Sequence, residues 1–473
     1  MNNIKHKDLD IPKDNPFKNC KLGRSKNAEV LTAIIDTYAD GFVLAVNNKW
    51  GTGKTTFIKM WQQQLENSDY KTLYFNAWEN DFESSPLIAL MGEFKTLIPG
   101  AKGKATFKAL TKNAGVLAKN ILPTIAGAIA SKYINVGDIT ELIKNATEAG
   151  VEIFKDEIDK YSTKKNGLIE FRNTLKEFII ELKTDKPIVF IIDELDRCRP
   201  NYAVEVLENI KHFFNVPNIV FVLSIDKEQL SHAIRGVYGS EHIDADEYLR
   251  RFIDLEYQIP EPNTNTFCEY LYEYYDFNSF LKSENRKNHS EFHNDSTRFI
   301  SSVSKLITDG KLTLRQQEQI FGFTRLVLKT FNINYYVLPD VLIFLIYFRF
   351  YFPNLYSQIA SKILTLDELN SELNNVLPRQ VEADTYFINL IFIQAKIIYY
   401  YNNSFPIHER YKIINLDSET ANELFSLRSK YDLSEDSSKF KNAFKSIISS
   451  SFNSEIGIDY LISKINLLDN IVT

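Results

Sequence analysis

Cysteine is scarce in this chain of 473 residues, which contains only Cys20, Cys198 and Cys268. Three cysteines so widely spaced can form neither a disulfide framework nor a zinc knuckle, and they predict a reducing compartment. The first thirteen residues are charged and contain no apolar run, so they predict no secretory signal. We therefore expect the protein in the cytoplasm.

Long uninterrupted apolar stretches are also lacking. The segment 114–130 is interrupted by Lys119 and is shorter than the roughly 20 residues that a membrane-spanning helix needs. The segment 335–352 is rich in aromatic and aliphatic residues, but it carries Asp340 and Arg349 and predicts a buried helix of a helical domain. No transmembrane segment is predicted.

Neither sign of charge is in large excess, since 55 Lys and Arg against 61 Asp and Glu give a net charge of −6. This mild acidity argues against nucleic-acid binding over the whole surface, but a local basic patch stays open. Between Phe94 and Gly137 there is no acidic residue, and Lys104, Lys108 and Lys112 share one helical face. The helix predicted next is acidic. The two helices form either a hairpin that neutralises its own charge or a basic surface for a membrane, a nucleic acid or a partner.

The first half of the chain alternates short apolar runs with helical periodicity, which is typical of a parallel sheet covered by helices. The predicted strands are 42–46, 72–75, 188–192 and 219–223. Polar residues follow three of these strands, and ligands of open α/β sheets bind at the carboxyl ends of the strands. We therefore expect the functional site at this edge of the sheet.

A glycine-rich loop follows the first predicted strand and precedes a helix-forming run. It consists of Asn48 and, after Lys49, Trp50-Gly51-Thr52-Gly53-Lys54-Thr55-Thr56. The glycines let successive backbone N–H groups face phosphate oxygens at a helix N-terminus. Lys54 would reach the β and γ phosphates, and Thr55 would ligate Mg²⁺. Asn48 replaces the first glycine of the usual pattern, and asparagine tolerates left-handed backbone angles better than most residues.

A second motif consists of an apolar strand that ends in Asp193-Glu194 and is followed by Leu195-Asp196-Arg197. It predicts a Walker B strand, in which Asp193 holds Mg²⁺ and Glu194 orients the attacking water. Buried carboxylates need a nearby cation, and Lys54 with Mg²⁺ would supply it. Arg197 is expected to pair with Asp196 or to contact a neighbouring subunit.

These motifs together resemble the KAP family of P-loop NTPases over about residues 10 to 330. The segments that carry the resemblance are Leu22-Gly23-Arg24, Trp50 to Thr55, Phe75-Asn76-Ala77-Trp78-Glu79, Ile192 to Cys198, Val222 to Asp226 and Tyr248 to Phe252. The resemblance implies an α/β fold with an additional-strand, AAA+-like parallel sheet sandwiched by helices. It also implies ATP as the nucleotide. Of the motif residues, we expect Trp78 to pack in the core.

Several further residues have two interpretations each. Ser224 either contacts the γ phosphate or the lytic water, or is a hydroxyl at a strand end. Asp226 is expected to cap the helix that follows it. Arg250 and Arg251 are candidates for an arginine finger, or else form a charged helix face that pairs with nearby acidic residues. Arg315 starts a helix, where the resemblance suggests a nucleotide-sensing arginine and the alternative is a surface residue.

The strand-like runs end before Pro260-Glu261-Pro262, so we predict a domain boundary there. The NTPase domain would span 1–260, with a helical insertion at about 99–186, and an all-α domain would span 261–473. The insertion is too polar to cross a membrane. The segment 283–296 is rich in polar residues and is expected to be an exposed loop.

The sequence thus predicts an Mg²⁺-dependent ATPase that couples nucleotide binding and hydrolysis to conformational change or assembly, as a homo-oligomer or with an effector protein. The resemblance to a phage-exclusion family implies a role in bacterial defence. Two alternatives stay open: a nucleotide-gated scaffold with little turnover that presents its helical domain to an effector, and a peripheral membrane ATPase that docks through the basic segment 102–132. Glu194 favours an enzyme, because a pure binder has less need of a water-positioning carboxylate.

Overall fold

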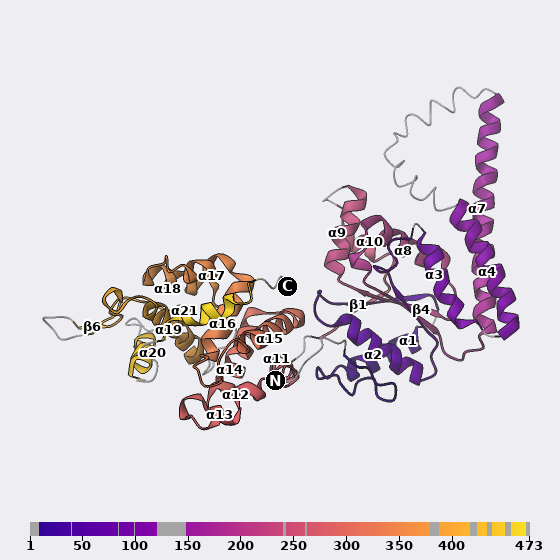
Figure 1. Cartoon of the computed structure of the whole chain (residues 1–473). Coiled ribbons are helices and arrows are strands. Elements are labelled where there is room, and N and C mark those ends of the chain that lie inside the picture. Colours follow the sequence, from indigo (N-terminus) through magenta and orange to yellow (C-terminus); the bar gives the residue numbers. More distant parts are fainter. Residues whose placement is uncertain are drawn as a thin grey trace. The chain divides into compact units, whose positions relative to one another are not determined.

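The computed structural model of the chain describes residues 9–38, 40–83, 85–98, 100–120, 148–239, 243–260, 263–378, 387–416, 423–432, 438–449 and 456–469. The chain divides into two compact units, Asp8–Glu261 and Pro262–Thr473 (Figure 1).

A five-stranded sheet forms the centre of the first unit, and every strand pair in it is parallel. Its strands are β1 (Phe42–Asn47), β2 (Thr72–Asn76), β3 (Ile188–Asp193), β4 (Ile219–Ile225) and β5 (Leu255–Gln258). The order is β2-β3-β4-β1-β5, so β4 lies between the strands that carry the two predicted nucleotide motifs. This is the additional-strand arrangement, and the predicted fold class is confirmed.

All four predicted strands are present, and each is one or two residues longer than predicted. The fifth strand, β5, was not predicted. It has the sequence Leu-Glu-Tyr-Gln, and three of its four residues are exposed. An edge strand of this kind lacks the apolar run that marks a strand buried on both faces.

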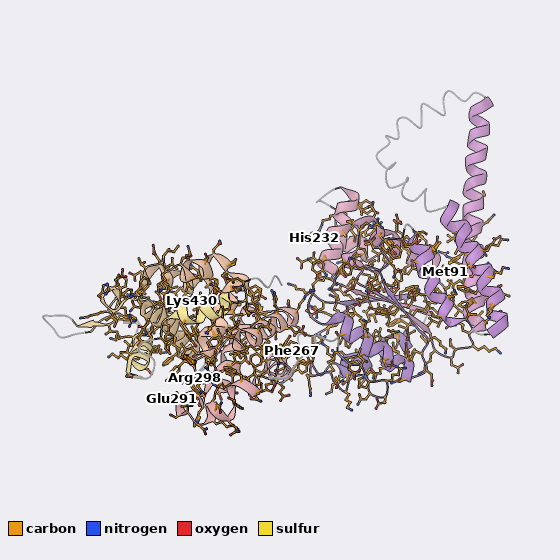
Figure 2. The ribbon with its side chains drawn as sticks, viewed as in Figure 1. Met91, His232, Phe267, Glu291, Arg298 and Lys430 are labelled. Atoms are coloured by element: carbon orange, nitrogen blue, oxygen red, sulfur yellow. The ribbon has the colours of Figure 1, made fainter. Side chains whose placement is uncertain are left out.

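Helices cover both faces of the sheet, because alternate residues of each strand point to opposite sides. On one face, Leu44 and Val46 of β1 share a buried cluster with α1 and α2. On the other face, Val43 and Ala45 share a cluster with α3, α4, α7, α8, α9 and α10. Met91 of α3, labelled in Figure 2, lies in this second cluster. The bounds are α1 Ser25–Thr37, α2 Lys54–Asn67, α3 Pro86–Phe94, α4 Gly100–Asn120, α7 Glu148–Glu181, α8 Pro200–Phe213, α9 Lys227–Tyr238 and α10 Ala245–Leu249.

The predicted insertion contributes α4 and α7, which lie side by side at the edge of the unit (Figure 1). Leu110 of α4 and Phe171 of α7 are fully buried in one cluster, and Asn113 Nδ2 donates a hydrogen bond of 3.1 Å to Thr174 Oγ1. The two helices therefore pack through their apolar faces. The segment 121–147, which holds part of the predicted basic and acidic stretches, lies outside the described residues.

The described residues of the second unit form helices and one short antiparallel pair, β6 (Asn415–Leu416) with β7 (Glu423–Leu424). Its α16 is buried along nearly its whole length, as predicted for the segment 335–352. No helix of the described part of the chain is long and apolar enough to cross a membrane. The main helices are α11 Thr264–Tyr274, α12 Asn278–Leu281, α13 Glu284–Lys287, α14 Asp295–Gly310, α15 Leu314–Leu328, α16 Pro339–Tyr351, α17 Pro353–Ala360, α18 Leu366–Val376, α19 Phe387–Asn403, α20 Ser438–Ser449 and α21 Ile458–Asn466.

Most residues of the segment 283–296 are exposed, as expected, but the segment is not a plain loop. This segment forms α13 and a short 3-10 turn, and Arg286 within it is only 1% exposed. Its guanidinium pairs with Asp295 at 2.5 Å and donates to the backbone oxygens of Ile333 and Tyr335, each at 2.8 Å. Arg286 therefore links this segment to backbone carbonyls that lie about fifty residues further along the chain.

Replacing Arg286 with methionine should destabilise the protein strongly, because it leaves the Asp295 carboxylate buried without its cation. The expected loss is about 3–5 kcal/mol of unfolding free energy, measured by urea denaturation of the full chain. Lys287→Met is the matched control, since Lys287 pairs with Glu284 on the surface, and it should cost less than about 1 kcal/mol. Equal shifts in the two variants would contradict the structural role of Arg286.

Candidate functional site

The glycine-rich loop connects β1 to α2 and depends on its two glycines. Gly51 has a φ of 76° and Gly53 a φ of 75°, both in the left-handed region that side chains with a Cβ disfavour. Gly53 occupies the N-cap of α2, and Lys54 is the first residue of that helix. The sharp turn aims the start of α2 at the carboxyl edge of the sheet.

The physical reason predicted for Asn48 is wrong. Its backbone is not left-handed. Its side chain instead donates a hydrogen bond of 3.0 Å to the Ile259 oxygen and accepts one of 2.9 Å from the Lys49 N–H. Asn48 therefore stabilises the loop by tying it to the chain that follows β5.

Lys54 is nearly buried, with 9% of its surface exposed. Its Nζ donates to the backbone oxygens of Asn48, at 2.6 Å, and Lys49, at 3.2 Å. Burial lowers the pKa of the ammonium, and the nearby carboxylates of Asp196, Asp226 and Asp193 oppose that effect. Three acidic residues from two other strand ends thus lie close to one cation.

Asp193 ends β3 and is 1% exposed. One carboxylate oxygen accepts from the Tyr74 hydroxyl at 2.9 Å, and the other accepts from the Glu194 N–H at 3.0 Å. Tyr74 was not predicted as part of the site. Burial and the carboxylate of Asp193 raise the pKa of its hydroxyl, which stays protonated and can donate.

Glu194 has a φ of 61°, an unusual conformation for a residue with a side chain. Backbone strain of this kind costs about 1–3 kcal/mol and is concentrated at functional sites. Its carboxylate forms an ion pair of 2.6 Å with Arg197 and accepts a hydrogen bond of 3.3 Å from Asn76 Nδ2. The expected pairing of Arg197 with Asp196 is therefore wrong. The turn after β3 brings Arg197 back to Glu194 instead.

Ser224 provides a test of whether a ligand fits here. It is fully buried on β4, and its Cα is the register partner of Asp193 on one side and of Val46 on the other. Its hydroxyl has no hydrogen-bond partner among the described residues. A buried polar atom without a partner is rare in a native fold. A polar group such as a phosphate oxygen or an ordered water would satisfy it.

Two carboxylates tie the loop to the neighbouring strand ends. The Trp50 indole N–H donates to Asp196, and the Trp50 backbone N–H donates to Asp226 at 3.2 Å. Asp226 also accepts from the Gln229 N–H and caps α9, which confirms its predicted role. Trp50 thus links the end of β1 to residues that follow β3 and β4.

The remaining loop residues lie at its outer side and at the first turn of α2. Thr52 donates from its hydroxyl to the Lys49 oxygen at 2.7 Å. Thr55 and Thr56 are half-buried at the start of α2. Thr55 and Asp193 have the hydroxyl and carboxylate oxygens that Mg²⁺ prefers, so both fit the predicted metal role.

Arg24 was used only as part of the family resemblance and was missed as a site residue. It precedes α1 and is 4% exposed. Its guanidinium donates to the backbone oxygens of Thr52, at 2.8 Å, and Gly53, at 3.2 Å. A single arginine after Gly23 gives no local signal of this contact, because the contact spans almost thirty residues.

The predicted packing of Trp78 in the core is wrong, since this side chain is 55% exposed. It follows β2 at the carboxyl edge, and the Arg197 guanidinium lies 6.0 Å from its ring centre. Trp78 therefore belongs to the surface beside Glu194.

Arg250 and Arg251 form no hydrogen bond or ion pair with the loop among the described residues. Arg250 is exposed and forms an ion pair of 3.2 Å with Glu247, which is the alternative named for it above, and Arg251 is exposed beside it. Arg315 is an exposed residue at the start of α15 in the second unit. Their nucleotide roles stay predictions.

A parallel sheet with β4 between β1 and β3, and a glycine loop that delivers Lys54 at the start of α2, define a P-loop NTPase. The model of the KAP family P-loop domain matches residues 24–334. The match covers more than half of the chain, and the chain belongs to this family.

The chain is also similar to two known proteins. The Phage T7 exclusion protein of Escherichia coli (strain K12) is 22% identical over 235 residues, which are 46% of this chain and 30% of that protein's length. A solved structure of the Aeropyrum pernix ORC2 protein in ADPNP–ADP complexes aligns with 14% identity and a TM-score of 0.32, over 90% of this chain and 95% of that one.

Asp196 should make the stability of the protein depend on pH. Burial raises the pKa of its carboxyl above the usual 3.8, despite the Trp50 hydrogen bond and Lys54. The charged form is therefore disfavoured by folding, and stability falls as the pH rises from 3.8 through the folded pKa. Asp196→Asn should gain stability relative to the wild type as the pH rises from 4 to 8, measured by urea denaturation. Asp246→Asn, at an exposed site, is the control, and a difference that is constant with pH would contradict the burial effect.

Proposed function

We propose that this protein is an Mg²⁺-dependent ATPase that couples ATP binding and hydrolysis to conformational change or assembly. The observation that carries the proposal is the convergence of Lys54 with Asp193, beside the Ser224 hydroxyl, which has no hydrogen-bond partner in the part of the chain that the structure describes. A lysine at a helix start next to a glycine nest suits a phosphate chain. A carboxylate beside it suits a divalent cation.

The chemistry follows from positioning and charge neutralisation. The N–H groups of the loop would hold the phosphates, and Lys54 would exchange its two carbonyl partners for phosphate oxygens. Thr55 and Asp193 would hold Mg²⁺, which when bound neutralises charge on the β and γ phosphates. Ser224 would contact the γ phosphate or the lytic water.

Glu194 would orient and polarise the attacking water. It can do so only after its carboxylate leaves the ion pair with Arg197, since that contact at 2.6 Å occupies its Oε1 oxygen. Turnover would therefore be low until this pair opens. Arg250 or Arg251 of a second copy would complete the site, and Arg315 would sense the nucleotide.

The biological role that we propose is bacterial defence against phage in the cytoplasm, with an effector protein as partner. Its support is the similarity to the Phage T7 exclusion protein. Because the aligned region spans only 30% of that relative, its role is transferred here as a proposal alone.

Glu194→Gln should bind ATP as the wild type does. Its phosphate release should be slower by a factor of about 10² or more, because the amide cannot polarise water. Lys54→Ala should lose nucleotide-induced thermal stabilisation, whereas the wild type should gain about 2.7 kcal/mol at a ligand concentration of 100 times Kd. Both are measured on the full chain with MgATP.

The matched control is Glu284→Gln, which removes an exposed carboxylate of the second unit and should leave both readouts unchanged. Phosphate release is measured over a series of protein concentrations, because a site completed by a second copy gains specific activity as copies associate. Wild-type protein that stays loaded with ATP and releases no phosphate at any concentration would favour the scaffold alternative. Equal stabilisation of Lys54→Ala and the wild type would rule out the loop as the binding site.

A second candidate is docking to an anionic membrane surface through α4. Lys104, Lys108 and Lys112 are exposed, and the opposite face of the helix is buried against α7. Among the described residues none of the three forms an ion pair. Such a row attracts an anionic surface by about 1 kcal/mol per lysine. The predicted segment 102–132 extends beyond the described residues.

Changing these three lysines to glutamate should weaken binding to phosphatidylserine vesicles on the order of 10²-fold, in a cosedimentation assay at low salt. Binding of the wild type should fall as salt is raised. Lys71, Lys282 and Lys329 are exposed and lie outside the helices and strands, and changing all three to glutamate gives a control with the same net charge. If the control loses as much binding as the α4 variant, the face of α4 is not the docking surface. If this face of α4 binds nucleic acid and not vesicles, it is a nucleic-acid-binding surface and not a membrane-docking surface.

A further inference from the structure

Arg24 contacts the nucleotide loop from the side opposite to the expected phosphates. Its two terminal nitrogens donate to two successive backbone oxygens, Thr52 O at 2.8 Å and Gly53 O at 3.2 Å. The Gly53 oxygen also accepts the first hydrogen bond of α2, from the Phe57 N–H at 3.1 Å. One side chain thus holds the last two peptide groups before the helix.

Because the peptide bond is planar, this contact also fixes the direction of the neighbouring N–H groups. In a trans peptide, the C=O of one residue and the N–H of the next point in opposite directions. When the oxygens of Thr52 and Gly53 point at Arg24, the N–H groups of Gly53 and Lys54 point away from it, toward the inside of the loop. These are the donors that a phosphate at the start of α2 would meet.

The charge of Arg24 is also unusual. The side chain is buried, and among the described residues no carboxylate forms a hydrogen bond or ion pair with it. Its Nε is buried without a hydrogen-bond partner. Burying a cation without a counter-charge costs several kcal/mol, and burial lowers the pKa of this guanidinium. An anion inside the loop would supply the missing negative charge across a single layer of backbone.

We propose that Arg24 is a positioning residue of the triphosphate site. It holds the carbonyls of Thr52 and Gly53 so that the next two N–H groups face the phosphates, and it adds positive charge behind the loop. This inference rests on the proposed function, because it needs a phosphate ligand in the loop. Arg24 itself touches neither the substrate nor the reacting atoms.

A purely structural role for Arg24 and a positioning role predict different effects on the melting temperature and on nucleotide affinity. Arg24 precedes α1, and its backbone oxygen accepts from the N–H groups of Asn27 and Ala28. If the side chain only stabilised this helix start, its loss would lower the melting temperature and leave nucleotide affinity unchanged. A positioning role instead weakens affinity in protein that is still fully folded.

The test is titration calorimetry of the full chain with MgADP and MgATP at 15 °C, on Arg24→Met, Arg24→Lys and the wild type. Arg24→Met should raise Kd for both nucleotides by about 10- to 100-fold, as expected for the loss of charge-assisted bonds to two carbonyls. Arg24→Lys keeps the charge but loses the planar guanidinium, so its Kd should lie between those of Arg24→Met and the wild type. Circular dichroism verifies folding at the same temperature.

Arg172→Met is the matched control, because Arg172 also donates to a backbone oxygen, that of His212 at 2.8 Å, outside the site. It should lower the melting temperature slightly and leave Kd within twofold of the wild type. If Arg24→Met binds both nucleotides within twofold of the wild type, the positioning role is wrong and the proposed function stands. If Arg24→Met does not fold, Arg24→Lys decides: a Kd raised at least threefold supports the inference and an unchanged Kd overturns it. Wild-type protein that binds neither nucleotide would overturn both.

Discussion

A buried ammonium surrounded by carboxylates is the constraint on which this site depends. Lys54 begins α2, Asp193 ends β3, and Asp226 follows β4. Parallel strands have their carboxyl ends at one edge of a sheet, so the register of β1, β4 and β3 brings these charges together. Neither sign could be buried alone at tolerable cost. The loop conformation and the sheet order therefore support each other.

Trp50 extends this dependence beyond the charges. It hydrogen-bonds to Asp196 through its indole and to Asp226 through its backbone, so one loop residue joins three strand ends. A ligand that moves the loop must carry or break these two bonds. Asp196 lies two residues from Glu194 and one from Arg197. These two residues form an ion pair, and Glu194 supplies the carboxylate proposed to act on water. Trp50 is thus connected to the Glu194–Arg197 pair through Asp196 and a short stretch of chain.

Where the sequence interpretation failed, the failure concerned side-chain partners. Asn48 was assigned a backbone role and instead bonds to the chain after β5, some two hundred residues away. Trp78 was assigned to the core on its size alone and lies at the surface. Arg286 was assigned to an exposed loop, but it is buried and donates to a backbone oxygen of the segment that follows α15. Composition and spacing describe the local chain, whereas burial depends on what the distant chain brings.

The sequence by itself determined the class of the protein, the strands β1 to β4 and the two motifs. Those features are local, because strand apolarity and the need for glycine at a left-handed turn act within a few residues. Only the tertiary structure decided that Arg24 contacts the loop, that Arg197 pairs with Glu194, that β5 completes the sheet and that the Ser224 hydroxyl has no hydrogen-bond partner among the described residues. The Arg24 contact, the pairing of β5 and the surroundings of Ser224 depend on segments far apart in the chain, and no single segment encodes them. Arg197 and Glu194 are only three residues apart, but their pairing depends on the turn that follows β3.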